Sequence, residues 1–166
     1  MIKTTKNQDF LTKNEQRKMT YSKKLGILAF CLILTNFMTA QVSPYEIKKG
    51  NPLRKVILDS IRTPTSAELG QKVEFVVGAM MVKGDWAFVN GMLQQPGGKP
   101  LDKTKFVDKD YRERGEEGLF DDNFQAILQK KKGKWMIIKR ALGCTDVCWL
   151  EWRGKIKGME DAIFPQ

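Results

Sequence analysis

Apolar residues between positions 51 and 62 recur at the spacing of one helical face. They stand at i, i+3, i+4 and i+8, namely at Leu53, Val56, Ile57 and Ile61, as in an amphipathic helix. Asn51 is a suitable N-cap, and Pro52 fits the first helical position, where a missing backbone N–H costs nothing. Because Pro64 disfavours helical backbone in the residue before it, the pattern predicts a helix over 51–62 that ends near Pro64.

Four later stretches are rich in β-branched and aromatic residues and predict strands. They are "KVEFVVGAMMV" (72–82), "WAFVNGMLQ" (86–94), "NFQAILQK" (123–130) and "WMIIKRAL" (135–142). Short turns, "KGD" and "KKGK", join them into two hairpins. Residues 41–50 predict only a polar lead-in, and the charged residues 101–122 predict a long loop of the functional or mobile kind.

This order of elements predicts the α+β class. We expect the N-terminal helix to pack on a four-stranded antiparallel sheet made of the two hairpins, because such a sheet needs one covered face. A short C-terminal helix is expected after Gly143. The single α+β domain would span 51–166, after the polar lead-in over 41–50 and a leader over 1–40.

The leader has the layout of a secretory signal peptide. A basic pair, an apolar run of about ten residues and two small residues follow one another in "KKLGILAFCLILTNFMTA", which predicts cleavage near Ala40. The run is short for a membrane span, which takes about twenty residues. We therefore expect no stable span after cleavage, with an uncleaved anchor as the alternative. Met19 opens a conventional signal peptide, so residues 1–18 are interpreted as a gene-calling extension.

Charge and the lack of histidine narrow the function classes. The chain has 29 Lys and Arg against 19 Asp and Glu, and residues 1–40 hold seven and two of these, which leaves a net charge of +5. No nucleic-acid partner is expected, because such binders usually have a denser basic stripe. The chain has no histidine, which excludes Ser–His and Cys–His nucleophile pairs and the usual zinc and copper sites. Neither a cofactor nor a metal ion is expected.

Cys144 and Cys148 are the two cysteines after the leader, and export would place them where disulfides persist. Five residues in an extended strand would separate the two Cα atoms by roughly 13 Å, whereas a disulfide needs about 7 Å or less. A bond therefore requires "CTDVC" to turn, and Thr145 or Asp146 is placed to cap a helix there. We expect a disulfide that fixes local shape and contributes about 1–2 kcal/mol at most. Two free thiols are the alternative.

Four residues are candidates for binding. Trp149 and Trp152 stand three apart, on one face of the expected short helix. They form either an aromatic platform for a sugar or peptide or a part of the core, and we favour the core. Tyr111 and Arg112, in the charged segment, are the pair best suited to a partner contact.

No catalytic residue is assigned, but Asp121 and Asp146 are the acids to test. In that alternative a pocket lies between helix and sheet, one of these carboxylates is the base, and Tyr111 is the acid. Arg62 is interpreted either as a surface residue or as the buried partner of Asp121 or Asp146. The simpler role for Asp146 is that of a helix cap.

The stretches "RKVILDSIRTP", "KVEFVVGAMMVKGDWAFV", "GLFDDNFQAILQKKKGKWMIIKRAL" and "TDVCWLEW" together resemble a family of small exported bacterial proteins that has no assigned function. The resemblance covers about 51–152 and departs from the family at the two cysteines. The layout is similar to the cystatin-like or NTF2-like folds, in which a bent antiparallel sheet wraps on a helix. Those folds host binders, inhibitors and enzymes alike, so the resemblance implies no function.

These features favour an exported, non-enzymatic binding or interaction module of the cell envelope, periplasmic or secreted. Its expected partner is an envelope protein or a cell-wall fragment. A small carboxylate-dependent enzyme is the alternative. Burial separates the two: a deep pocket that holds an acid of raised pKa favours the enzyme, and a filled core beside exposed aromatic residues favours the binder.

Overall fold

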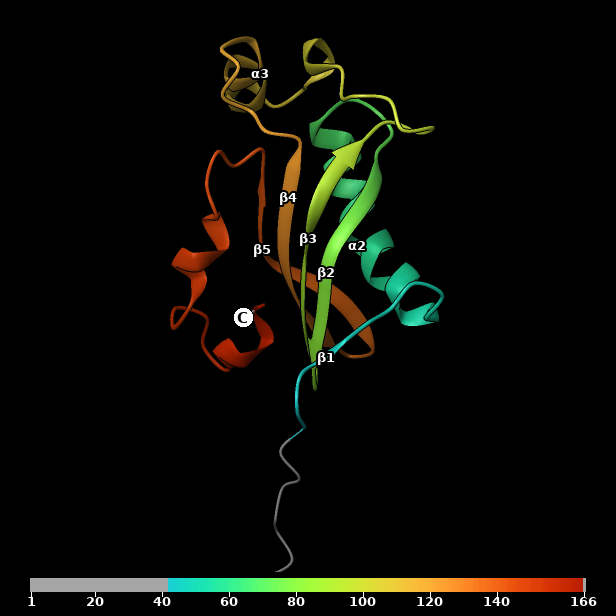
Figure 1. Ribbon diagram of the computed structural model, residues 1–166, viewed down its shortest axis with the longest axis vertical. Coiled ribbons are helices and arrows are strands. Elements are labelled where there is room, and N and C mark those ends of the chain that lie inside the picture. Colours follow the sequence, from blue (N-terminus) through green and yellow to red (C-terminus); the bar gives the residue numbers. More distant parts are fainter. Residues whose placement is uncertain (1–41, 166) are drawn as a thin grey trace, which may run out of the picture. The chain divides into compact units, whose positions relative to one another are not determined.

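The computed structural model describes residues 42–165. Five antiparallel strands form one sheet in the order β1-β2-β3-β4-β5, and helix α2 and the C-terminal segment lie on opposite sides of the strands (Figure 1). The strands are β1 (Tyr45–Glu46), β2 (Glu74–Lys83), β3 (Trp86–Gln94), β4 (Asn123–Lys131) and β5 (Lys134–Leu142). The α+β class is confirmed, and the sheet has one strand more than the four predicted. The predicted leader and its cleavage near Ala40 lie outside the described residues.

The helices of the described part are few and mostly short. They are α2 (Pro52–Glu68), α3 (Lys109–Glu116) and three 3₁₀ turns, η1 (Lys103–Lys105), η2 (Cys148–Trp152) and η3 (Asp161–Ile163). Within residues 42–165, every helix is too short or too polar to cross a membrane.

The extra strand lies in the segment predicted as a polar lead-in. Tyr45 and Glu46 pair with Val82 and Met81 of β2, and Ile47 beside them is 1% exposed. A two-residue strand is too short to show the alternation by which strands are recognised in a sequence. The lead-in prediction is therefore wrong for this part of the chain, which is held by one apolar anchor and an edge pairing.

Helix α2 continues through Pro64, so its predicted end near that residue is wrong. Pro64 removes one N–H donor, but Thr65 after it is fully buried. Arg140 of β5 donates to Thr65 Oγ1 at 2.8 Å and also pairs with the Glu68 carboxylate. These contacts with the last turn offset an internal proline, which by itself costs about 3 kcal/mol.

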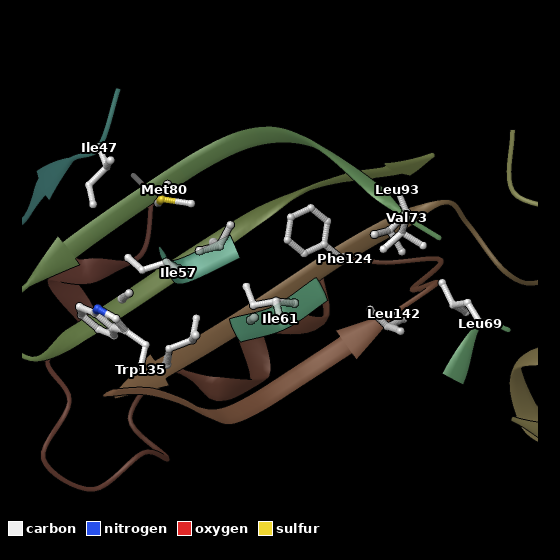
Figure 2. Close-up of a cluster of buried hydrophobic side chains, with 14 of the residues drawn as sticks. Ile47, Ile57, Ile61, Leu69, Val73, Met80, Leu93, Phe124, Trp135 and Leu142 are labelled. Atoms are coloured by element: carbon white, nitrogen blue, oxygen red, sulfur yellow. The ribbon is translucent and has the colours of Figure 1, made fainter. Parts of the chain in front are cut away.

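The main core lies between α2 and the sheet. Asn51 caps α2 as predicted, because its Oδ1 accepts a hydrogen bond from Leu53 N at 2.9 Å. Ile57 and Ile61 of α2 are fully buried and point toward the strands, among Met80, Phe124, Trp135 and Leu142 (Figure 2). The space between helix and sheet is therefore filled by side chains.

The two predicted hairpins are confirmed, and they join side by side because β3 pairs with β4. Lys131 pairs with Lys134 across the second turn. The two residues between them, Lys132 and Gly133, have φ values of 50° and 80°, the left-handed backbone that favours two-residue hairpin turns.

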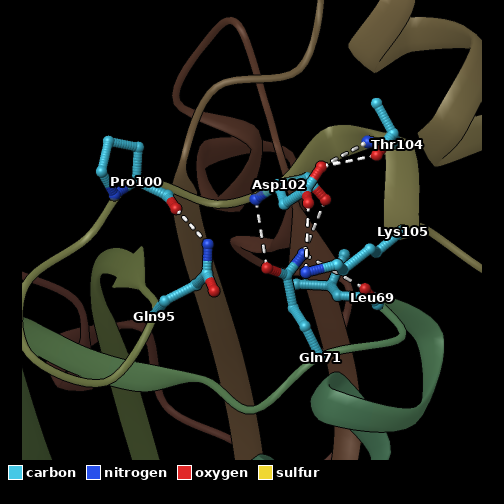
Figure 3. A network of polar contacts seen from close by, with 7 residues as sticks. All are labelled: Leu69, Gln71, Gln95, Pro100, Asp102, Thr104 and Lys105. Carbon is cyan, nitrogen blue, oxygen red and sulfur yellow. Dashed lines mark hydrogen bonds and ion pairs between the residues drawn. The ribbon is translucent and has the colours of Figure 1, made fainter.

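Residues 101–122 are more ordered than the predicted loop. They contain η1 and α3, and three buried anchors hold them, Leu101, Phe106 and Phe120. The Gln71 side chain also accepts from Asp102 N at 3.1 Å and donates to Asp102 O at 2.9 Å, as Figure 3 shows. The sequence did not predict this order because α3 buries none of its residues and therefore has no apolar helical face to recognise.

The C-terminal segment covers part of the second sheet face, which the sequence did not predict. Phe88, Ile127, Trp152, Ile163 and Phe164 form a second buried cluster there. The expected short C-terminal helix exists as the 3₁₀ turn η2. Both faces of the sheet are thus covered in part, and the uncovered area beside this cluster is where a cleft lies.

Candidate functional site

A cleft of about 560 Å³ opens on the sheet face opposite α2. Phe88 of β3 lies in the second buried cluster on this face, and Asn90 and Met92 follow it on the same face because side chains alternate along a strand. Strands β2, β3 and β4 form the floor and the segment after β5 forms one wall. The side chains lining it include Val76, Asn90, Met92, Asn123, Gln125, Asp121, Cys144, Thr145, Asp146, Val147 and Trp149.

The floor contains a β-bulge that the cleft uses. The pairing of β2 with β3 shifts register between Val77 and Ala79, and Asn90 Oδ1 accepts from Ala79 N at 2.8 Å. A Cβ at Gly78 would lie 3.3 Å from that Asn90 oxygen, closer than ordinary contact. Glycine at position 78 therefore leaves room for the Asn90 side chain to approach the bulge and accept its hydrogen bond from Ala79 N.

Asn123 ties the floor to the wall. Its Oδ1 accepts from Cys144 N at 2.9 Å, and its Nδ2 donates to Cys144 O. Gly143 N also donates to Asn123 O at 3.0 Å. One side chain thus fixes where the wall leaves the sheet.

Cys144 and Cys148 are bonded in the wall of the cleft, with Cα atoms 6.3 Å apart. The predicted turn of "CTDVC" is present, but the predicted cap is wrong. Val147 is the N-cap residue of η2 and makes no side-chain cap hydrogen bond. The side chain of Asp146 accepts from Val147 N at 3.3 Å, and its backbone carbonyl accepts from Cys148 N at 2.9 Å. The disulfide therefore closes the turn without help from a cap.

The disulfide is tested by the intact mass of the exported protein, before and after alkylation without reductant. We expect the mass of a chain that begins at Gln41 and carries no alkyl group. After reduction the same protein should take two alkyl groups, because a bonded pair reacts only once it is cleaved. Two groups taken without reductant would return Cys144 and Cys148 to the free-thiol alternative.

Asp121 and Asp146 both line this cleft and are both exposed. The pocket of the enzyme alternative was expected between helix and sheet, and that location is wrong because the core fills it. Of the two interpretations of Arg62, the buried pair with Asp121 or Asp146 is wrong, and the residue lies at the surface. Arg62 pairs with Asp59 one turn earlier in α2, and its guanidinium lies 5.5 Å from the ring centre of Phe75.

Tyr111 and Arg112 lie on α3 and do not line the cleft. Tyr111 is half-buried, with its ring edge-on to Phe120 at 5.5 Å, and Arg112 is exposed. Burial, followed by the charge of Glu68, raises the pKa of Tyr111 above 10.0. A phenol of raised pKa is a poorer proton donor, and it is not brought together with either aspartate of the cleft.

The two candidate tryptophans have different surroundings. Trp152 is 3% exposed, and Lys139 Nζ lies 5.4 Å from its ring centre. Trp149 is half-buried at the cleft and stacks on Phe164 with centroids 5.1 Å apart. Arg153 lies over the same Trp149 ring at 5.2 Å. Trp152 is thus a core residue, and Trp149 is the one of the pair that borders the cleft.

Asp122, which follows Asp121 of the cleft lining, is a carboxyl group whose pKa is raised mainly by burial. Burial raises its pKa above 3.8, Lys103 opposes this and Asp121 adds to it. Its Oδ1 has no hydrogen-bond partner within residues 42–165. Asp122 therefore binds its proton more tightly in the folded state than in the unfolded chain. The stability that the protonated carboxyl contributes is lost as pH rises through the folded-state pKa.

Replacement of Asp122 by asparagine should reveal this effect. The free energy of unfolding of Asp122→Asn should gain on that of the wild type as pH rises between about 3 and 7, since only the wild type acquires a poorly solvated charge. Urea unfolding of both proteins at a series of pH values measures the difference. A difference that stays constant across this range contradicts the prediction.

No metal centre is evident in the described part. Within residues 42–165, no group of three or more acidic or cysteine side chains is placed to hold a metal ion. Comparisons of the chain with protein-family models, with curated proteins and with solved structures find no match. The resemblance of the sequence to a family of small exported proteins, and the cystatin-like or NTF2-like layout, therefore stay predictions.

Proposed function

We propose that this chain is an exported, non-enzymatic binding module of the cell envelope, and that its ligand occupies the cleft beside the disulfide. The cleft is the observation that carries the proposal. Its volume of about 560 Å³ falls within the range of about 300–1,000 Å³ that is usual for small-ligand sites. Its lining combines apolar side chains with a few polar groups, which is the composition of such sites.

Some residues of the lining offer apolar surface to a ligand, and others offer polar groups. Val76, Met92 and Val147 are about half-exposed, at 50%, 48% and 46%, and offer apolar surface that a ligand would remove from water. Asp121 and Gln125 offer polar groups that would orient it. The disulfide supports export, because such bonds persist mainly in oxidising compartments.

The enzyme alternative has one observation in its favour, which is that Asp121 and Asp146 line the same cleft. Its proposed acid, Tyr111, is absent from the lining, and both aspartates are exposed rather than deeply buried.

The proposed partners would present different chemical groups to the cleft. An envelope protein would present a peptide segment, and a cell-wall fragment would present a sugar or a stem peptide.

The proposal is tested by calorimetric titration of the mature protein with three soluble ligand classes: short acetylated peptides, chito-oligosaccharides and disaccharide-peptides released from cell wall. We expect saturable binding of at least one class. Val76→Arg should abolish it by filling the floor of the cleft. Val56→Arg is the matched control, because Val56 is 53% exposed and lies on α2, at the other sheet face.

Two results would count against the proposal. One is the absence of saturable binding with all three classes. The other is equal binding by the Val76→Arg and Val56→Arg variants, which would place the ligand outside the cleft. Thermal unfolding of each variant shows that both are folded before the titration is interpreted.

A further inference from the structure

We infer that the turn between β4 and β5 binds this protein to the surface of an anionic phospholipid membrane. This part of the chain is called the lysine turn below, and it consists of Lys130, Lys131, Lys132 and Lys134. The inference does not depend on a ligand in the cleft, because no residue of the lysine turn lines the cleft. It adds a second contact surface and the class of partner that this surface fits.

The lysine turn concentrates positive charge that the fold leaves unpaired. Its four side chains are exposed, and none of them has a carboxylate partner among the described residues. Residues 129–139 hold five lysines and no acidic residue. Exposed lysines elsewhere do form ion pairs, as Lys55 does with Asp59 and Lys109 does with Glu113. The turn is thus a local cluster of free charge, which the basic composition of the chain does not by itself explain.

The pairing of the two strands brings like charges together in this turn. Lys131 pairs with Lys134 across the strands, and like charges directly opposite each other destabilise a strand pair. Asp85 in the turn between β2 and β3 accepts from Lys130 N at 2.7 Å, but through its backbone carbonyl. Its carboxylate has no ion-pair partner among the described residues. An anionic surface would therefore supply a compensating charge that the fold does not.

The charges of the molecule are separated along its strands. Figure 1 shows α3 at one end of the sheet and the β4–β5 turn at the other. Residues 102–122, which include α3, hold eight acidic and five basic residues. Such a charge distribution orients a protein in the field of an anionic surface, here with the lysine turn toward the surface and α3 away from it. Asp121 of the cleft lies at the α3 end of β4, so a membrane at the turn leaves the cleft open.

Two exposed apolar side chains follow the lysine turn on β5. Met136 is 53% exposed and Ile138 is 39% exposed, and β5 is an edge strand of the sheet. Protein segments that bind membrane surfaces combine basic residues with apolar side chains that enter the boundary between headgroups and acyl chains. Met136 stands two residues after Lys134, so charge and apolar surface are offered at the same place.

The chemistry of the lysine turn favours a lipid surface over other polyanions. Its cations are all lysines, whose compact, hydrated ammonium groups suit a diffuse negative surface, whereas arginine suits paired recognition of single phosphates or carboxylates. Trp135 beside them is 7% exposed and belongs to the main core, so it offers no open ring on which nucleic-acid bases could stack. A soluble acidic polymer would meet the lysines but has no apolar layer to receive Met136 and Ile138.

The test is sedimentation of the mature protein with two kinds of vesicle, one of phosphatidylcholine alone and one of equal parts of phosphatidylcholine and phosphatidylglycerol. We expect binding to the anionic vesicles only, and release as salt is raised. The combined variant Lys130→Gln, Lys131→Gln and Lys134→Gln should bind the anionic vesicles at least about tenfold more weakly, since each lysine near such a surface strengthens binding about fivefold.

A matched control removes the same number of positive charges at the α3 end of the sheet. Its exposed lysines are replaced together as Lys72→Gln, Lys99→Gln and Lys109→Gln. This variant has the same net charge as the first, so it should bind the anionic vesicles much more nearly as the wild type does. A third variant, Met136→Ser with Ile138→Ser, keeps every charge and should bind them severalfold more weakly than the wild type. Thermal unfolding shows that each variant is folded before its binding is interpreted.

Three results would overturn the inference. The first is that the wild type does not bind the anionic vesicles at low salt. The second is an equal loss of binding by the two triple variants, which would mean that net charge acts rather than the lysine turn. The third is unchanged vesicle binding by the Met136 and Ile138 variant, because the turn would then attract any polyanion, such as polyglutamate or single-stranded DNA. None of these results bears on the proposed function, which depends on the cleft alone.

Discussion

Replacement of Gly143 by alanine is expected to lower the free energy of unfolding by about 4 kcal/mol. Gly143 has a φ of 66°, a left-handed conformation that strains other residues. A Cβ there would also lie 2.3 Å from Cδ2 of Phe120. Phe120 cannot move aside easily, because it is 1% exposed and packs against Phe106 at 4.8 Å. Backbone strain and overpacking therefore add together.

Gly133→Ala is the matched control for this prediction. Gly133 has a φ of 80° but nothing within 4 Å of the added Cβ, so it should show the backbone strain alone, about 1 kcal/mol. Urea unfolding followed by circular dichroism measures both variants. If both variants lose the same free energy of unfolding, the ring of Phe120 moves aside to accommodate the added Cβ, and its packing is not rigid.

Replacement of Trp152 by alanine is the second large effect, an expected loss of about 3–5 kcal/mol. Trp152 is 3% exposed and packs with Phe88 and Ile127 on the second sheet face. Its removal leaves a cavity under the segment that also carries Trp149. We therefore expect the C-terminal segment to detach more readily and the wall of the cleft to become less ordered.

Leu150→Ala separates this loss from a general weakness of η2. Leu150 lies in the same turn and is 51% exposed, so its truncation should change the free energy of unfolding by no more than about 0.5 kcal/mol. Denaturant titration compares the two variants. If Trp152→Ala proves as mild as Leu150→Ala, the Trp152 ring is not a core element, and the aromatic platform becomes the better interpretation.

Residues 143–149 contribute both to the stability of the fold and to the proposed ligand site. Gly143 begins the wall of the cleft, Asn123 holds its backbone, and the Cys144–Cys148 bond closes the turn that carries Asp146. Reduction of the disulfide should therefore weaken ligand binding more than it lowers global stability, since a bond across so short a loop restricts the unfolded chain little.

Part of the site was visible in the sequence, but its assembly was not. Asp121, Asp146, Trp149 and Cys144 were singled out by residue type, and only the fold brings them to one cleft. Asn123 and Gln125 were missed. Their signal was a polar residue at every second position in the otherwise apolar start of "NFQAILQ", which places both on one face of a strand.

The sequence by itself determined the elements that depend on neighbouring residues. The start of α2 at Asn51 and Pro52 and the two hairpins with their turns follow from capping, backbone preference and alternation. These act over a few residues, so one stretch of chain contains the whole cause.

The tertiary structure alone decided the rest. Helix α2 passes Pro64 because Arg140, 75 residues after Thr65, bonds to its last turn. Ile47 is ordered by its pairing with Met80, and the C-terminal segment is placed by burial of Phe88 and Trp152 together. In each case the deciding energy comes from contact between residues distant in the chain, which no local pattern records. The location of the cleft, opposite α2 rather than beneath it, follows from these same contacts.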